Sequence, residues 1–305
     1  MQLRVATCQF PTSSDIPANR DWVLQLLREA AARGADVAHF PEAGLSGYAG
    51  ADLASYDQFD WPGLSAALED VLALAAELRL WVLLGAAHRL TAPNKPHNSL
   101  YIIDAEGGIV DRYDKRFLSG DASGATGDLA HYSPGDHFSV FKVKGVICGA
   151  LICVDCRYPE LYREYKRRNV QLIFHSFHSG HIRPDDFAAR EKQVGAEYFA
   201  LNPATTLPGI TQPAMMHAAA GSNHMWISCS NSAAFRSCWS SFFVRPDGVI
   251  IGRLPEHKAG VLISTMDTEQ LFYDSTLAWR NRATDGVLNS GTLVHDPRST
   301  DRTTI

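Results

Sequence analysis

Residues 149–160 read GALICVDCRYPE, and the rest of the chain is interpreted outward from this stretch. The apolar run predicts a buried strand that brings Cys153 to its carboxyl end, after which Pro159 opens a helix. Open α/β sheets carry their chemistry where strands feed helices, and a helix dipole or nearby cation can hold a thiol there as thiolate. Cys153 is therefore a candidate nucleophile. The alternative is a buried structural cysteine, which is common for a free thiol.

The chain on either side alternates between strand and helix patterns, which predicts an α/β fold around buried sheets. Residues 1–282 contain no repeat and no linker, so one domain is expected there, followed by a C-terminal tail over 283–305. Strands are expected at 3–10, 37–40, 81–85, 98–104, 109–113, 138–143, 146–154, 171–174, 225–230, 240–245, 248–253 and 260–265; helices are expected at 18–33, 64–78, 160–168 and 187–201. A loop is expected around Pro203, Pro208 and Pro213.

Two further strand ends carry ionisable side chains. The short apolar run before Pro41 ends at Glu42, and a carboxylate in such a pocket can shuttle protons. Lys115 ends a hairpin strand, where an ammonium could stabilise an oxyanion and lower the pKa of a thiol. Taken singly, Glu42 could equally be a solvated turn residue and Lys115 one charge of a surface run.

Taken together and in this order, these motifs resemble the nitrilase superfamily of carbon–nitrogen hydrolases. The resemblance covers nearly the whole chain. Its motifs are VATCQ at 5–9, FPE at 40–42, YDK at 113–115, SPGD at 133–136, the cysteine block, and SFFVRPDG at 241–248. The resemblance implies an α/β fold of four layers, the αββα sandwich of the carbon–nitrogen hydrolase type, which dimerises to a larger layered sandwich.

The resemblance also implies a site that cleaves a non-peptide C–N bond without metal or cofactor. In it, Cys153 is the nucleophile, Glu42 the general base and Lys115 the group that stabilises the oxyanion, together with the backbone N–H of Val154. Many members carry a second glutamate seven residues before the Gly of the Pro-Gly turn. Asp128 stands at that position here, so it either helps to position substrate or leaves the role unfilled.

One departure from the family pattern bears on the substrate. True nitrilases usually follow the nucleophile with Trp-Glu, whereas this chain has Val154-Asp155, which resembles the amidase and carbamoylase branches. We therefore expect a small linear amide that is cleaved through a Cys153 thioester with release of ammonia. An N-carbamoyl amine or N-carbamoyl amino acid is the alternative; a nitrile substrate, or binding without catalysis on the same fold, is less favoured.

Other residues are expected to shape the pocket. Tyr48 follows the Glu42 loop, and His175 and His178 follow the strand after the nucleophile, so all three are expected to contact substrate. An inserted segment at about 181–213 is expected to form a lid or a further dimer contact. Two arginines in this segment indicate either a carboxylate-bearing substrate or a solvated helix face: Arg183 and Arg190.

The spacing of His175, His178 and His181 also fits a metal site, because imidazole is the commonest metal ligand. However, Gly180 and Pro184 break any helix that would align the three rings, and no acidic partner stands at motif spacing. No metal site is therefore expected.

Cys153 and Cys156 form a C-x-x-C pair, which is also the spacing of a redox motif. Such motifs usually open a helix early in a small domain, whereas this one lies mid-chain with Pro159 still to come. Cys156 is therefore expected to pack as an ordinary side chain. Arg157 and Glu160 are expected to anchor the nucleophile turn through salt bridges.

Composition excludes several classes of protein. The 305 residues include 28 Lys+Arg and 33 Asp+Glu, a net charge of −5, and no basic run, which argues against a nucleic-acid partner. No apolar run reaches the roughly 18–20 residues of a membrane helix, and the N-terminus enters a strand pattern directly. Six cysteines are too few for a disulfide scaffold. We expect a cytoplasmic homodimer or larger homo-oligomer.

Overall fold

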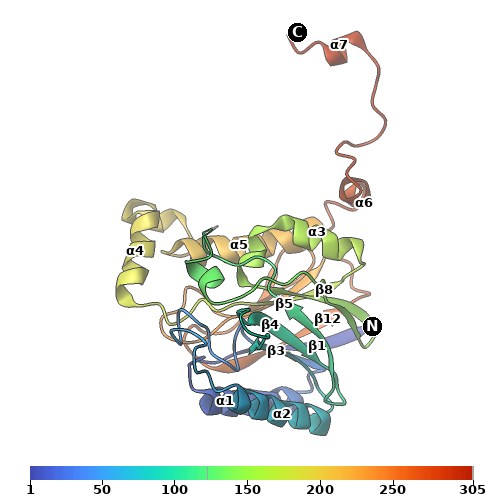
Figure 1. The fold of residues 1–305 in the computed structure, drawn as a ribbon. Coiled ribbons are helices and arrows are strands. Elements are labelled where there is room, and N and C mark those ends of the chain that lie inside the picture. Colours follow the sequence, from blue (N-terminus) through green and yellow to red (C-terminus); the bar gives the residue numbers. More distant parts are fainter. Residues whose placement is uncertain (122, 304–305) are drawn as a thin grey trace.

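The computed structural model describes residues 1–121 and 123–303, and in it two six-stranded sheets pack face to face with helices on both outer surfaces. Figure 1 shows the four layers, with α1 and α2 on one side and α3 and α5 on the other. The expected αββα sandwich is thereby confirmed.

In the first sheet, the N-terminal strand lies second from one edge. Its strands lie in the order β12 (Gly260–Asp267), β1 (Gln2–Gln9), β2 (Val37–His39), β3 (Trp81–His88), β4 (His97–Ile103) and β5 (Ile109–Asp114). β1, β2 and β3 are parallel, and the remaining pairs are antiparallel. Because side chains alternate between faces, Ala6 and Cys8 pack under helices α1 (Ile16–Ala32) and α2 (Trp61–Leu78), whereas Val5 faces the other sheet.

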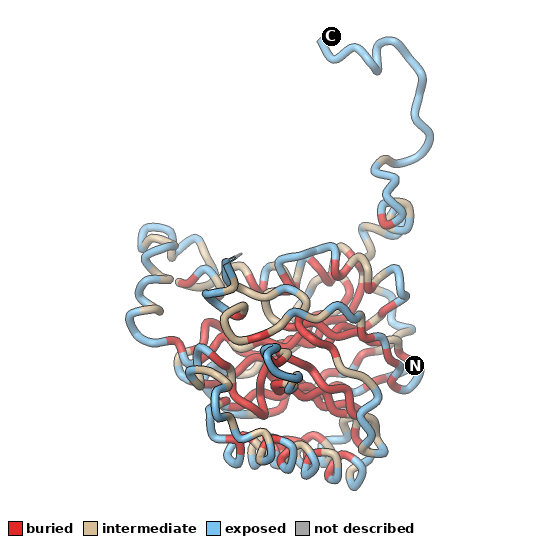
Figure 2. The backbone as a smooth tube through the Cα atoms, in the orientation of Figure 1, coloured by how far each residue is buried: buried red, intermediate tan, exposed pale blue. Residues whose placement is uncertain are grey.

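The second sheet repeats this plan around the cysteine strand. Its order is β11 (Ile250–Arg253), β10 (Phe242–Val244), β9 (Trp226–Ser230), β8 (Leu172–Ser176), β7 (Val146–Ile152) and β6 (Val140–Val143). β7, β8 and β9 are parallel, so their carboxyl ends meet at one edge. Helices α3 (Pro159–Arg167) and α5 (Leu207–Asn223) lie on its outer face, and the interior between the sheets is buried (Figure 2).

The prediction of a loop around Pro203, Pro208 and Pro213 is wrong from residue 207 onward, because the chain forms α5 there. Thr206 accepts a hydrogen bond from Gly209 N as the helix cap, and Pro208 lies in the first turn, where no backbone donor is needed. The helix then buries one face at helical spacing, and this burial outweighs the bond lost at Pro213. The buried residues are Gly209, Gln212, Pro213, Met216, Ala219, Ala220 and Asn223.

The preceding helix is shorter than expected. α4 (Pro184–Val194) ends at Gly195, which has a φ of +87°, and the 3₁₀ turn Ala196–Leu201 follows. No residue of α4 is buried, and Figure 1 shows this helix at the margin of the sandwich.

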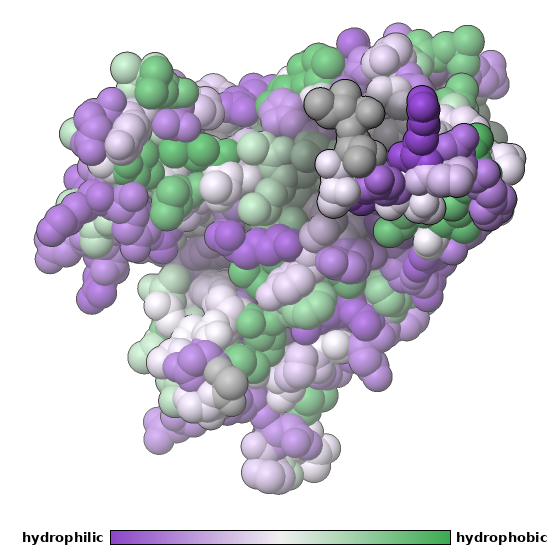
Figure 3. Space-filling model, turned by 90° about the horizontal axis from the view of Figure 1, so that it is seen from above, coloured by the Kyte–Doolittle hydropathy of each residue, from purple (hydrophilic) through white to green (hydrophobic). Residues whose placement is uncertain are grey.

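The last described residues extend away from the sandwich (Figure 1) through the short helices α6 (Arg280–Thr284) and α7 (Pro297–Thr300). Viewed from this side, the surface mixes hydrophilic and hydrophobic residues (Figure 3). Within the described ranges, no helix is both long and apolar enough to cross a membrane.

Candidate active site

The three predicted catalytic residues follow the ends of three strands. Glu42 follows β2, Lys115 follows β5, and Cys153 follows β7. Cys153 has a φ of +47°, which lies in the left-handed region that a non-glycine residue rarely adopts. As predicted, Pro159 is the first residue of the helix after this turn.

The nucleophile turn is held by Asp155, which was not predicted. Its carboxylate accepts hydrogen bonds from Ile152 N at 3.0 Å, Phe117 N at 2.9 Å and the Tyr113 hydroxyl at 2.8 Å. Burial raises the pKa of Asp155 to about 6. The prediction that salt bridges of Arg157 and Glu160 anchor this turn is wrong, since both side chains are exposed and neither forms an ion pair with a described residue.

The Glu42 loop is pressed closely against the first sheet. A Cβ on Gly85 in β3 would lie 2.1 Å from Pro41 O, so only glycine lets the loop pass at this point. Gly135 has the same role for Lys115: its N–H donates to Lys115 O at 2.9 Å, and a Cβ would lie 2.4 Å from Asp114 O. The Pro-Gly turn therefore fixes the backbone that carries the lysine.

Glu42, Lys115 and Asp128 form a buried charge cluster. Lys115 Nζ donates to Glu42 Oε1 and to Asp128 Oδ2, both at 2.7 Å. Asn98 Nδ2 donates to the same Glu42 Oε1 at 2.8 Å, whereas Glu42 Oε2 has no hydrogen-bond partner among the described residues. Glu42 and Lys115 are 0% and 1% exposed. One carboxylate oxygen is thus fixed, and the other is free to accept a proton.

The electrostatics of the thiol differ from the sequence-based expectation. Burial and the Glu42 carboxylate hold the pKa of the Cys153 thiol well above its usual value, although the Lys115 ammonium acts in the opposite direction. Burial also disfavours the Lys115 ammonium, but Glu42 outweighs this and holds the pKa of Lys115 well above its usual value. At neutral pH the resting site therefore contains a neutral thiol beside a charged lysine.

Asp128 occupies a defined position beside the lysine. Besides Lys115, it accepts from Ser119 N at 3.1 Å and from the Tyr48 hydroxyl. Burial opposes its charge, but Lys115 holds the pKa of Asp128 below its usual value. Asp128 is therefore a charged carboxylate that holds both the Lys115 ammonium and the Tyr48 hydroxyl.

His175 lies behind the nucleophile. Its ring is fully buried and stacks on Phe177 with centroids 4.3 Å apart. Nε2 lies 3.2 Å from Cys153 O and Nδ1 lies 2.8 Å from the Tyr162 hydroxyl. Because a carbonyl only accepts, Nε2 carries the proton and donates it, so Nδ1 accepts from Tyr162. Burial lowers the pKa of His175 to about 3, which agrees with a neutral ring.

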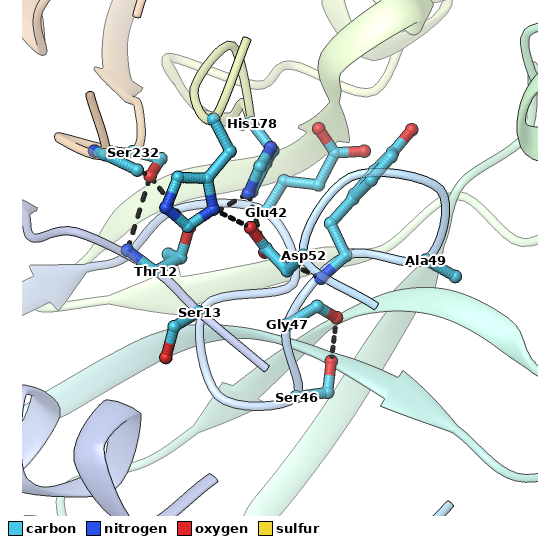
Figure 4. A network of polar contacts seen from close by, with 12 residues as sticks. Thr12, Ser13, Glu42, Ser46, Gly47, Ala49, Asp52, His178 and Ser232 are labelled. Atoms are coloured by element: carbon cyan, nitrogen blue, oxygen red, sulfur yellow. Dashed lines mark hydrogen bonds and ion pairs between the residues drawn. The ribbon is translucent and has the colours of Figure 1, made fainter. Parts of the chain in front are cut away.

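His178 and His181 join a different group. His178 Nε2 lies 2.9 Å from Asp52 Oδ2 and 2.9 Å from the Thr12 hydroxyl, and Figure 4 shows the ring between these residues. His181 Nδ1 contacts the other oxygen of Asp52. The three histidines considered as an alternative metal site therefore do not converge, and no metal-ligand cluster is found in the part of the chain that the structure describes.

A cavity of about 480 Å³ opens onto Cys153. Tyr48, Asp128 and His178 line it, as expected for substrate contacts, whereas His175 and Val154 do not. Cys156 lies outside the cavity lining, with its Sγ 3.7 Å from Met215 Sδ, as expected for a packed side chain. Arg190, one of the two arginines for which a carboxylate-bearing substrate was considered, also lines it, whereas Arg183 does not. Three further lining residues were not assigned to the pocket from the sequence: Ile182, Pro208 and Gln212.

Asn98 is a further site residue that the sequence analysis missed. It is the second residue of β4, and its carbonyl accepts from Lys115 N at 2.9 Å, so it lies beside the lysine in the hairpin. A bulge between Ile102 and Ile103 shifts the register of this hairpin, so counting outward from the Gly107-Gly108 turn would not have placed Asn98 beside Lys115.

This chain is similar in sequence and fold to several known proteins. The sequence matches the family model described as carbon-nitrogen hydrolase over residues 4–271. The 2-oxoglutaramate amidase of Bacillus subtilis is 27% identical over 175 residues, which cover 57% of this chain and 64% of that enzyme. Omega-amidase NIT2 of Homo sapiens is 29% identical over 173 residues, covering 56% and 61%. The chain thus aligns with less than two thirds of the length of these relatives.

Solved structures of an amidase from Nesterenkonia sp. AN1 share the fold. A mutant in complex with butyramide is 20% identical with a TM-score of 0.67, covering 87% of this chain and 90% of that one. Another mutant of that amidase, with the same identity, TM-score and coverage, shows covalent addition of the acetamide moiety of fluoroacetamide at the active-site cysteine.

Proposed function

The chain belongs to the carbon–nitrogen hydrolase family, and from this premise we propose that it is a thiol-dependent amidase that releases ammonia from a small amide through a Cys153 thioester. The observation that carries the proposal is that the two carboxylate oxygens of Glu42 have different surroundings. Oε1 is held by Lys115 and Asn98, while Oε2 is buried without a partner.

In the proposed reaction, the free Oε2 of Glu42 accepts the Cys153 thiol proton as sulfur attacks the amide carbon. The raised pKa of the thiol requires such a base at the moment of attack. The carbonyl oxygen becomes an oxyanion. Lys115 has three N–H donors and gives two to carboxylates, so the third is available to this oxyanion, together with Val154 N–H.

Collapse of the tetrahedral intermediate then breaks the C–N bond. Glu42 returns its proton to the departing nitrogen, which leaves as ammonia, and a Cys153 thioester remains. Glu42 next takes a proton from water while the water oxygen attacks the thioester carbon. The C–S bond breaks, the product leaves as a carboxylic acid, and the thiol recovers its proton. Asp128 keeps Lys115 charged and in place throughout.

The names of the relatives support an amide substrate, because the matched proteins include a 2-oxoglutaramate amidase and an amidase bound to butyramide. The alternative is an N-carbamoyl amine or N-carbamoyl amino acid, which would release carbon dioxide as well as ammonia. Val154 after the nucleophile favours both over a nitrile.

The test is ammonia release by the wild type and by Cys153→Ala from matched amides, N-carbamoyl compounds and nitriles. We expect turnover of amides by the wild type and none by the variant. Turnover that survived in Cys153→Ala would overturn the thiol mechanism. Preference for N-carbamoyl compounds would select the alternative, and binding without turnover would favour a non-catalytic protein.

We also propose a homodimer, with residues beyond the sandwich contributing to the contact. Leu271, Tyr273 and Leu288 are at least 80% exposed, which is unusual for side chains of this size. Light scattering of the wild type and of a Leu271→Ser/Tyr273→Ser variant tests this, and a monomeric wild type would overturn it. The cytoplasmic location and the role of 283–305 as a separate tail remain predictions.

A further inference from the structure

Arg190 brings a positive charge to the catalytic cavity. It lies on α4 and lines the same cavity as Cys153. Its Nη1 lies 3.6 Å from Cys238 Sγ, a weak acceptor, and no carboxylate of the described residues lies within ion-pair distance of it. By contrast, Arg183 on the same segment is 81% exposed and is paired with Asp186. Arg190 is thus half-buried at the cavity, and Asp186, which is paired with Arg183, interacts with it only at longer range.

Gln212 presents a second free donor to this cavity. Trp239 Nε1 lies 2.7 Å from Gln212 Oε1, and an indole nitrogen can only donate, so this contact fixes which end of the amide is oxygen. The NH₂ group of Gln212 has no partner among the described residues, and Gln212 lines the cavity. Two donors from different helices, one of them charged, therefore face a single space.

The other charged side chains that line the cavity also favour an anionic ligand over a cationic one. Asp128 is the carboxylate that lines it, and both of its oxygens are taken by Lys115, Ser119 and Tyr48. His178 carries positive charge more readily than an ordinary histidine, because Asp52 outweighs burial and raises the pKa of His178. Away from the Lys115 cluster, the cavity offers donors and positive charge without a free carboxylate.

We propose that Arg190 and Gln212 form a carboxylate subsite, so that the substrate is a linear amide whose far end carries a carboxylate. This inference rests on the proposed amidase function. Arg190 supplies the ionic hydrogen bonds and Gln212 NH₂ supplies a further donor, while Cys153 attacks the amide at the other end. A neutral amide of the same length binds without these contacts.

The experiment compares two pairs of probes: the monoamide of pentanedioic acid against pentanamide, and the monoamide of butanedioic acid against butanamide. We expect wild type to prefer the anionic member of at least one pair. Arg190→Gln should lower kcat/KM for the anionic amide about 10- to 100-fold, the usual effect of losing charge-assisted hydrogen bonds, with little change for the neutral one. Arg183→Gln, on the same segment, is the matched control and should leave both values unchanged.

Gln212→Glu supplies an independent arm, since it keeps an oxygen for Trp239 but replaces the free donor by a carboxylate. This variant should lower kcat/KM for the anionic amide more than for the neutral one. Equal effects of Arg190→Gln on charged and neutral amides, or none on either, would overturn the subsite.

Calorimetric binding of the same four probes to Cys153→Ala separates this result from failure of the proposed function. If no amide is hydrolysed but the anionic probes bind and lose affinity in the Arg190→Gln background, the subsite stands and the amidase proposal fails. Equal binding of charged and neutral probes would reject the subsite.

Discussion

The strand-end cluster and the inserted segment border the same cavity but are built in opposite ways. Glu42 and Lys115 are fully buried, and each is held by hydrogen bonds to other strands or loops of the sandwich. The segment at 181–213 begins at the margin of the sandwich (Figure 1), where helix α4 buries none of its residues, and it ends in the first turns of α5. It nevertheless supplies Arg190 and part of the cavity wall.

This difference separates reactivity from selectivity. A buried charge is costly unless it is paired, so the cluster tolerates few changes and retains its geometry. An exposed helix can change its sequence with small effects on folding, so it can vary what the cavity recognises. Changes in the cluster should therefore reduce turnover of every substrate, whereas changes in the segment should alter the ranking of substrates.

The largest effect should come from Glu42→Gln. The amide can still accept from Lys115 and Asn98, but it cannot take a proton from Cys153 or from water. We expect kcat to fall about 10²- to 10⁴-fold for all amides, the usual contribution of general acid–base catalysis. Single-turnover measurements with charged and neutral amides check this. A loss confined to one substrate class would contradict the assignment of reactivity to the cluster, because Glu42 would then determine selectivity.

Asp128 should have the next largest effect. Asp128→Asn removes one of the two carboxylates beside Lys115 and presents an NH₂ group to donors, so we expect about a 100-fold loss in kcat/KM, corresponding to a lost hydrogen bond to a charged group. Asp128→Glu restores the residue type that resembles the family pattern and should retain most of the activity. Equal losses in both variants would indicate that the length of the side chain matters as much as its charge.

The same contrast explains what the sequence could predict. Cys153, Glu42 and Lys115 each follow a strand, and strand ends can be found from apolar runs and turn residues. Most strands were also placed within a few residues, because apolar runs and turn residues mark them. The convergence of the three residues, however, depends on the order of strands in the sheets, which only the family resemblance supplied.

The segment could not be predicted in this way. Pro203, Pro208 and Pro213 indicated a loop, yet packing of one face against the second sheet made a helix from residue 207. Gln212 became a cavity residue only through that helix, and its free donor depends on Trp239, 27 positions away. Such contacts are decided by tertiary packing, which no local pattern encodes.

Asn98 offers a finer test of the cluster. Its amide holds Glu42 Oε1 and stabilises the carboxylate, so Asn98→Ala should lower kcat about tenfold, within the range for a hydrogen bond to a charged group. The loss should appear in kcat and not in KM, because Asn98 contacts Glu42 and does not line the cavity. An unchanged kcat would mean that Asn98 only supports the fold. Asn94→Ala, on a nearby exposed turn, is the control.

The smallest effect should lie between the two regions, at the contact of Asp52 in the Glu42 loop with His178, which precedes the inserted segment. Burial opposes charge on His178, but Asp52 raises its pKa above the ordinary 6.5, and the pair lowers the pKa of Asp52 despite burial. The stability that His178 contributes is therefore complete below its ordinary pKa and is lost as pH rises through the raised value.

Urea unfolding across this range tests the contact. The free energy of unfolding of the wild type should fall as pH rises above neutral, and in Asp52→Asn this fall should shrink, because the histidine no longer has an anion to hold its proton. Its pKa then drops, and the variant should instead lose stability toward acid, where the unfolded chain binds a proton that the buried ring does not. His137→Asn is the matched control, since the His137–Asp111 pair has its histidine 53% exposed and should leave the pH dependence unchanged. If Asp52→Asn retained the wild-type slope, the contact of Asp52 with His178 would not be the source of this pH dependence.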